Sequence, residues 1–282
     1  MSIVLAISTF LYVNEPVAVM REAATKNSEV VSSAYYSEEI KILEELGDWL
    51  KIQTTCDAYE GWVPKNVIHT TANEFIPSAK VSRIAGLLYD RMDTSHGPIL
   101  RLPFESRLAV QDSSDKRWIK VTMHDQKVGF IQRGELSFNL EPCTRDEMIA
   151  LSEEFLNLPY IWGGRSSVGY DCSGFTQMLY RQMGVSIPRD SKDQMNDEQF
   201  LVVEKPKAGD LIFWGLAEDK IRHVGLSLGG DLFIHATVRE NKPWIHKSSL
   251  SDPEWDGSGK GDAGYAFRCF RSLKSNRREQ HA

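Results

Sequence analysis

One cysteine and two later histidines have the types and spacing of a nucleophilic site. Cys172 lies in a Gly-rich segment, residues 169–177 (GYDCSGFTQ), and His223 and His235 follow in apolar stretches. A thiol attacks as the thiolate, and a helix N-terminus with an imidazole nearby lowers the pKa of a thiol. The sequence therefore predicts an ionised Cys172 at the mouth of a groove. The plain alternative is a buried structural cysteine.

The segment around Cys172 predicts a helix from Cys172 to Met183, with Gly184 just beyond its C-terminus. Asp171 precedes it and can accept from the amides of Ser173 or Gly174 as an N-cap. The same carboxylate raises the pKa of a neighbouring thiol, so the helix dipole and an imidazolium have to outweigh it.

The two histidines fall on strands expected at residues 223–228 and 232–237. Side chains alternate along a strand, so the rings share a face only in one hairpin register. A three-residue loop at 229–231 sets Gly225 opposite His235, whereas a two-residue loop places the rings on opposite faces. With the first register, His223 is the base and His235 holds its tautomer. A lone histidine in an apolar strand is otherwise more often a hydrogen-bonded core residue.

Upstream residues predict short strands rather than helices. Apolar and polar residues alternate at 17–20, 39–43, 49–53 and 61–63, and again at 84–89, 106–110, 118–121 and 128–131, with a hairpin turn at Gly47-Asp48. This weak internal repeat predicts two small barrels, with Trp49, Trp62 and Trp118 as core residues rather than a sugar platform. From Glu141-Pro142 the pattern becomes helical, with a capping box at residues 144–147 and Pro159 expected to end that helix. Helices followed by strands predict an α+β domain.

Composition excludes several classes of function. The net charge is −6, from 33 basic and 39 acidic residues, which disfavours nucleic acid or an anionic membrane as the main partner. The four cysteines are scattered, and no HExxH, paired CxxC or calcium-loop spacing is present, so we expect no disulfide framework, metal or cofactor. Residues 1–13 lack a positively charged segment, and no apolar run reaches transmembrane length, so the expected location is the cytoplasm.

Together the motifs resemble the NlpC/P60 family of papain-like cysteine peptidases. Six of them occur in order between residues 145 and 272: LPYIWGG at 158–164, YDCSGF at 170–175, PRDS at 188–191, AGDL at 208–211, RHVG at 222–225 and FIHA at 233–236. WLKI at 49–52 and YEGWV at 59–63 make the N-terminal repeat similar to tandem bacterial SH3 domains. The resemblance implies a first SH3-like domain at 1–72, a second at 73–141, and a papain-like peptidase domain at 142–282.

The resemblance also implies roles for individual residues. Cys172 is the implied nucleophile, His223 the base and His235 the orienting residue, while the implied substrate-binding residues are Glu22, Tyr59, Trp162, Asp171, Ser173, Asp190 and Ser191. In relatives that select a free N-terminal L-Ala, a Glu and a Tyr of the first SH3 domain close one end of the cleft. Here Glu22 and Tyr59 match them, and Glu22, Asp171 or both would pair with the ammonium group. Ala58 departs from the pattern, in which Gly commonly precedes that Tyr.

The implied activity is that of a γ-D-glutamyl-L-diamino acid endopeptidase, which releases L-Ala-γ-D-Glu from murein peptides. We expect a monomer whose partner is the murein peptide. Two alternatives stay open on sequence alone: a non-catalytic module that binds murein or a protein, and an amidase or acyltransferase built on the same fold. The preferred diamino acid, meso-diaminopimelate or L-Lys, is not determined by the sequence.

Overall fold

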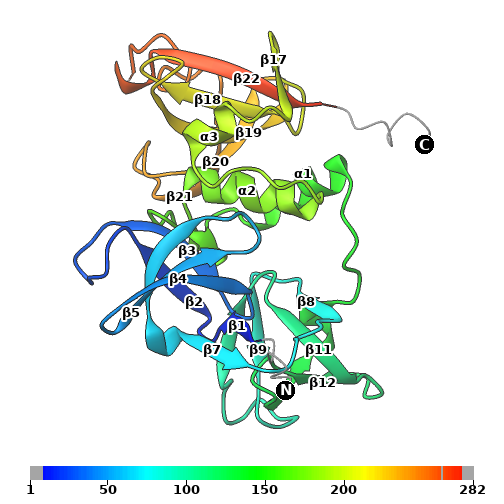
Figure 1. Cartoon of the computed structure of the whole chain (residues 1–282). Coiled ribbons are helices and arrows are strands. Elements are labelled where there is room, and N and C mark those ends of the chain that lie inside the picture. Colours follow the sequence, from blue (N-terminus) through cyan, green and yellow to red (C-terminus); the bar gives the residue numbers. More distant parts are fainter. Residues whose placement is uncertain (1–8, 262, 275–282) are drawn as a thin grey trace. The chain divides into compact units, whose positions relative to one another are not determined.

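The computed structural model describes residues 9–261 and 263–274 and divides into two compact units (Figure 1). The first comprises Met1–Glu141 with Ser166–Val168, and the second comprises Pro142–Arg165 with Gly169–Ala282. Residues 1–8, part of the N-terminal segment that lacks positive charge, lie outside the described residues. The further division at residue 72 stays a prediction.

The N-terminal part of the first unit is a small antiparallel β structure around its own apolar core. Its elements are β1 (Phe10–Val13), β2 (Val17–Arg21), β3 (Val30–Tyr35), β4 (Ile40–Leu46), β5 (Trp49–Thr54), β6 (Glu60–Pro64), η1 (Lys65–Val67) and β7 (Ile68–Thr71). Five strands form a sheet in the order β3-β2-β6-β5-β4, and β1 pairs with β7. Along β5 the side chains of Leu50 and Ile52 are buried while Lys51 is half-buried, as the alternation predicts. Leu46 pairs with Trp49, which confirms the two-residue turn at Gly47-Asp48.

A second set of strands in the same unit surrounds another core. It comprises β8 (Ala79–Val81), β9 (Ala85–Leu88), β10 (Leu100–Pro103), β11 (Arg107–Asp112), β12 (Trp118–Thr122), β13 (Val128–Gln132), η2 (Arg133–Glu135) and β14 (Leu136–Ser137). The main sheet has the order β13-β12-β11-β8-β14, and β9 pairs with β10. Trp62 and Trp118 are buried, as expected of core residues, but Trp49 is only half-buried.

The second unit places helices before a sheet along the chain. Its elements are α1 (Arg145–Glu154), β15 (Arg165–Ser166), β16 (Gly169–Tyr170), α2 (Cys172–Gln182), α3 (Ser191–Met195), β17 (Phe200–Val203), β18 (Leu211–Gly215), β19 (Ile221–Gly229), β20 (Leu232–Thr237), β21 (Trp244–Ser249), η3 (Ala263–Tyr265) and β22 (Phe267–Leu273). Six antiparallel strands follow the order β17-β22-β18-β19-β20-β21. Helix α2 packs against β19 and β20, the two adjacent strands that carry the histidines (Figure 1).

The local signals at the helix ends are mostly confirmed. Thr144 and Glu147 form the reciprocal capping box at the start of α1, and Gly184 adopts a φ of 71° just after α2. The expectation that Pro159 ends the first helix is wrong. Helix α1 ends at Glu154, and Asn157, with a φ of 68°, has already turned the chain before the proline.

Candidate active site

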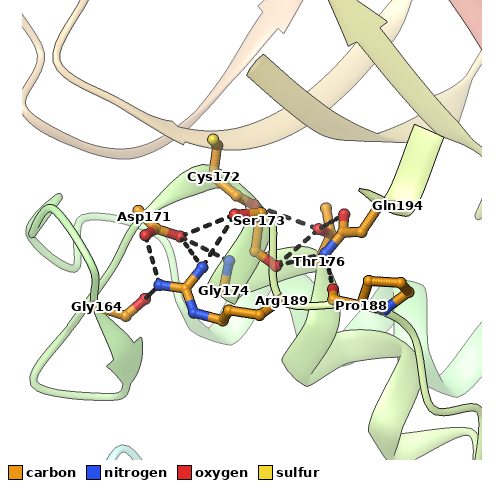
Figure 2. A network of polar contacts seen from close by, with 9 residues as sticks. All are labelled: Gly164, Asp171, Cys172, Ser173, Gly174, Thr176, Pro188, Arg189 and Gln194. Atoms are coloured by element: carbon orange, nitrogen blue, oxygen red, sulfur yellow. Dashed lines mark hydrogen bonds and ion pairs between the residues drawn. The ribbon is translucent and has the colours of Figure 1, made fainter. Parts of the chain in front are cut away.

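The sulfur of Cys172 lies at the N-terminus of α2 and against β19. Asp171 is the N-cap of the helix, and its Oδ1 accepts from the amide of Gly174 at 2.7 Å, as predicted. The amide of Val224, the residue after His223, donates a hydrogen bond to the Cys172 sulfur. Cys172 is only 8% exposed, and its side chain points away from the polar contacts around Asp171 (Figure 2).

A buried ion pair holds the start of α2. The Nη2 atom of Arg189 lies 2.6 Å from Oδ2 of Asp171, and Nη1 lies 3.0 Å from Oδ1. Nη1 also donates to the hydroxyl of Ser173 at 3.0 Å, and Nη2 to the carbonyl of Gly164 at 3.5 Å (Figure 2). A bidentate guanidinium–carboxylate pair fixes orientation as well as position. The pair therefore sets the direction in which the next residue, Cys172, leaves the loop.

A glutamine extends this network to the second turn of α2. Gln194, on α3, donates to the carbonyl of Ser173 at 3.0 Å and to that of Pro188 at 2.8 Å. Its Oε1 accepts from the hydroxyl of Thr176 at 2.9 Å (Figure 2). These contacts join the loop that carries Arg189 to the helix that begins with Cys172.

The two histidines meet on one face of the sheet. Nε2 of His223 lies 2.8 Å from Nδ1 of His235, and both rings are buried. Leu226 pairs with Ile234, the register that sets Gly225 opposite His235. The sequence therefore predicted the register correctly.

The connection that produces this register differs from the prediction. Gly229 pairs with Leu232, so the turn contains two residues, and the register shifts between Ser227 and Gly229. Two-residue closure alone would put the rings on opposite faces, but a bulge inserts one extra residue and restores the shared face. The turn and bulge use Gly229 at a φ of 89° and Gly230 at 60°, a conformation that a β-carbon disfavours.

Aromatic rings enclose His223 on several sides. Tyr265 stacks on it with the ring centroids 5.8 Å apart, and Trp255 and Trp214 lie at 5.2 and 5.6 Å. Burial, and then the electrostatic influence of Arg239 and His246, lower the pKa of His223 to about 3. Burial and the adjacent His223 lower that of His235 well below its usual value. Both rings are therefore neutral near pH 7.

The electrostatics of the thiol reverse the sequence expectation. Burial, followed by the negative charge of Asp171, raises the pKa of Cys172 to about 12, although the Val224 amide, Arg189 and the Ser173 amide oppose this. The expectation of a resting thiolate is wrong, because desolvation outweighs the helix terminus. With a neutral thiol and a neutral imidazole, the base takes the thiol proton only as attack begins.

The substrate-binding residues predicted in the second unit divide into two groups. Asp171 and Ser173 are buried within the Arg189 network, so the carboxylate of Asp171 already has a cationic partner within the protein. Its expected pairing with a substrate ammonium stays a prediction, in which the ammonium would be a second cationic partner besides Arg189. Asp190 and Ser191 are half-buried at the start of α3, and Trp162 is 61% exposed in the loop before β15.

Glu22 and Tyr59 belong to the first unit. Glu22 is exposed just after β2, and its amide donates to the carbonyl of Glu29 at 3.0 Å. Tyr59 is half-buried against the first core, and its carbonyl accepts from the amide of Thr54 at 3.0 Å. Ala58, before it, has a φ of 57°, which explains why glycine suits that position. Their role in substrate binding stays a prediction.

Sequence reasoning missed several residues of the site. Arg189 was part of a quoted motif, but nothing in the sequence marks it as the partner of a carboxylate 18 residues away. Tyr160 is another, because burial and then the charge of Cys172 raise the pKa of its hydroxyl. Ser248, whose hydroxyl lies 3.1 Å from Nε2 of His235, carries no motif signal at all.

One cluster in the described residues has the atoms of a metal site. Ligand atoms of His235, Glu240 and His246 all lie within 4.8 Å of one another. Hydrogen bonds to Ser248 already engage both His235 and Glu240, at 3.1 and 2.7 Å. No described helix has the length and apolar character needed to cross a lipid bilayer.

Comparisons with known proteins identify two families that this sequence matches. The profile of the NlpC/P60 family matches residues 157–258, and that of the bacterial SH3 domain matches residues 16–69. A protein of Bacillus cereus (strain ATCC 10987 / NRS 248) named gamma-D-glutamyl-L-lysine dipeptidyl-peptidase is 29% identical over 235 residues, 77% of this chain and 70% of that protein. Dipeptidyl-peptidase 6 of Lysinibacillus sphaericus is 29% identical over 247 residues, 80% of this chain and 86% of that protein.

A solved structure shares the fold over nearly the whole chain. The crystal structure of an NlpC/P60 family protein from Bacillus cereus ATCC 10987 superposes with a TM-score of 0.76 at 21% identity, covering 94% of this chain and 99% of that one. The chain therefore carries an NlpC/P60 cysteine peptidase domain together with a bacterial SH3 domain.

Proposed function

We propose that this protein hydrolyses the bond between the γ-carboxyl of D-Glu and a diamino acid in murein peptides with a free N-terminal L-Ala. The observation that carries the proposal is the convergence of Cys172 with the backbone after His223, together with the 2.8 Å contact between His223 and His235. The names of the relatives from Bacillus cereus and Lysinibacillus sphaericus support the bond and the dipeptide product.

In the first chemical step a neutral His223 takes the proton of the Cys172 thiol as the sulfur attacks the γ-carbonyl carbon. The new C–S bond places negative charge on the carbonyl oxygen, and backbone amides at the start of α2, where Cys172 lies, stabilise that charge. His223, now protonated, gives its proton to the leaving amine of the diamino acid as the C–N bond breaks. The acyl group stays on Cys172 as a thioester.

In the second step water releases the acyl group. Neutral His223 accepts a proton from the water as its oxygen attacks the thioester carbonyl. The C–S bond then breaks, the thiol of Cys172 regains its proton from His223, and L-Ala-γ-D-Glu leaves as a free acid. The rise in the pKa of Cys172 to about 12 supports this coupled transfer, because burial disfavours a resting thiolate.

Mass spectrometry of the products from L-Ala-γ-D-Glu-L-Lys tests the proposal directly. The wild-type protein should release L-Ala-γ-D-Glu and L-Lys, and Cys172→Ala should lower kcat at least a thousandfold while its unfolding midpoint is unchanged. Cys269→Ala, which removes a half-buried thiol on β22, is the matched control and should keep full activity. Substantial turnover by Cys172→Ala would overturn the assignment of the nucleophile.

Two further substrates separate the alternatives. The meso-diaminopimelate peptide measures the preference for the diamino acid, and the N-acetylated peptide measures the need for a free ammonium group. Equal rates with and without the acetyl group would remove the proposed role of Glu22 and Tyr59. Binding without any product would instead favour a non-catalytic module, and transfer of the dipeptide to an added amine would favour an acyltransferase.

Recycling of murein peptides by a monomer in the cytoplasm belongs to the same proposal. Cell fractionation and light scattering at the concentration of the activity assay test these two points.

A further inference from the structure

The hydrogen-bonded chain that begins at His223 continues beyond His235. Nε2 of His235 lies 3.1 Å from the hydroxyl oxygen of Ser248 on β21, and that hydroxyl donates to Oε1 of Glu240 at 2.7 Å. Glu240 lies between β20 and β21, so three adjoining segments of the sheet supply the chain. Serine and glutamate at these positions belong to no motif used to assign the active site.

The carboxylate of Glu240 ends the chain as an acceptor. Oε1 also accepts from Nε1 of Trp255 at 2.6 Å, and Oε2 from the ammonium of Lys242 at 2.8 Å. Burial opposes the charged form, but the hydrogen bonds from Lys242, Ser248 and Trp255 and the nearby His246 lower the pKa of Glu240 to about 2. An ionised carboxylate has no proton to donate, and so every group that contacts it must be a donor.

The acceptor at this end fixes which group donates in each hydrogen bond of the series from Glu240 back to His223. The hydroxyl of Ser248 has a single proton, which goes to Glu240, so its oxygen accepts from His235 and Nε2 of that ring carries a proton. A neutral imidazole has one N–H, which leaves Nδ1 of His235 as the acceptor for Nε2–H of His223 at 2.8 Å. Nδ1 of His223 is then the nitrogen with a free lone pair.

We propose that Ser248 and Glu240 are positioning residues that fix the tautomers of both histidines, so that Nδ1 of His223 is the atom that takes the proton of Cys172. This inference deepens the proposed function and rests on it. With the opposite direction, Nδ1 of His223 would carry the proton, and a neutral ring in that state cannot accept another there. Tautomer choice thus decides whether the resting site can begin the reaction.

Replacing Ser248 by alanine removes the hydroxyl that joins His235 to Glu240, and with it the constraint on the histidine tautomers. We expect Ser248→Ala to lower kcat on L-Ala-γ-D-Glu-L-Lys by roughly 10–100-fold and to leave KM within about twofold of the wild-type value. A general base contributes about 10²–10⁴ in rate. The expected loss is smaller because part of the variant protein keeps the active tautomer. Ser248→Thr retains a hydroxyl and should restore most of the rate. The matched control is Ser249→Ala on the same strand, whose hydroxyl bonds Asp231 and Ser251 instead, and it should leave kcat unchanged.

Nitrogen-15 NMR of the histidine rings gives a readout that a merely structural role would not change. In the wild-type protein near pH 7, His223 and His235 should both show the proton on Nε2, and Ser248→Ala should shift signal toward the Nδ1–H form. A proton on Nδ1 of His223 in the wild type, or full kcat in a folded Ser248→Ala, would overturn the inference. The spectrum needs no substrate, so a protein that fails to cleave the peptide still decides the question of tautomers separately from the proposed function.

Discussion

At the scale of single residues, the site depends on one ion pair that the chain keeps away from water. Arg189 is only 3% exposed, and its guanidinium donates hydrogen bonds to both carboxylate oxygens of Asp171. A buried pair of this kind contributes little net stability, but loss of one partner leaves an uncompensated charge. Arg189 is therefore a residue on which the position of Cys172 and the fold of the second unit both depend.

Arg189→Met should lower the free energy of unfolding by about 3–5 kcal/mol, because Asp171 would stay buried without its cation. Urea unfolding of wild type and variant at pH 7 measures the difference. Lys192→Met, which removes an exposed cation on α3 three residues away, should change stability by less than about 0.5 kcal/mol. Equal losses in the two variants would show that net charge, rather than the buried pair, is responsible.

The flanking residues, the hairpin register and the resemblance to the NlpC/P60 motifs selected Cys172, His223 and His235, whereas residue types alone favour a buried cysteine and core histidines. The protonation states could not be predicted in the same way. The pKa of Cys172 depends on how completely the thiol is removed from water, and burial is a property of the folded chain. The partners Arg189 and Ser248 were missed for the same reason.

At the scale of elements, strands with clean alternation were predicted closely, whereas an edge strand without it was missed. Residues 49–53 and 118–121 predicted β5 and β12 almost to the residue. The edge strand β17 has the pattern FLVV, with Leu201 and Val202 both exposed, so hydrophobicity does not alternate with burial. The loop of the histidine hairpin was predicted one residue too long, because a bulge and a longer loop produce the same register.

One loop carries conformational strain that a single substitution should relieve. Ala58 joins β5 to β6 with a φ of 57°, which costs an alanine about 1–2 kcal/mol, while glycine adds about 0.5–1 kcal/mol of entropy cost on folding. Ala58→Gly should therefore raise the free energy of unfolding of the first unit by roughly 0.5–1 kcal/mol. Thermal unfolding checks this against Ala72→Gly, an exposed alanine without a positive φ, which should be neutral or destabilising. A stability gain in both variants would contradict the explanation.

At the scale of the whole molecule, each of the two units buries histidine that must stay neutral. In the first unit, His124 is fully buried beside Tyr12 and Tyr36, and its Nε2 lies 3.1 Å from Oδ1 of Asn14. Burial lowers the pKa of His124 to about 4. In the second unit, burial lowers that of His223 to about 3. Lowering the pH should therefore reduce the stability of both units, because a buried neutral histidine in each binds a proton more readily in the unfolded state.

The direction of the change in stability with pH follows from how many protons the folded and unfolded states bind. Because the folded pKa of His124 lies below the value of 6.5 for an unfolded chain, the unfolded state binds more protons between pH 6.5 and 4, and the free energy of unfolding falls as the pH drops through that window. The full difference corresponds to about 3 kcal/mol, of which about 2 kcal/mol should be lost by pH 5. His124→Gln keeps a donor for Asn14 and should remove this loss from the first unit while the second unit keeps its own. Hydrogen exchange followed by mass spectrometry at pH 7 and 5, corrected for the intrinsic rate, separates the units by peptide. Equal acid sensitivity of the first unit in wild type and His124→Gln would assign the loss to other groups.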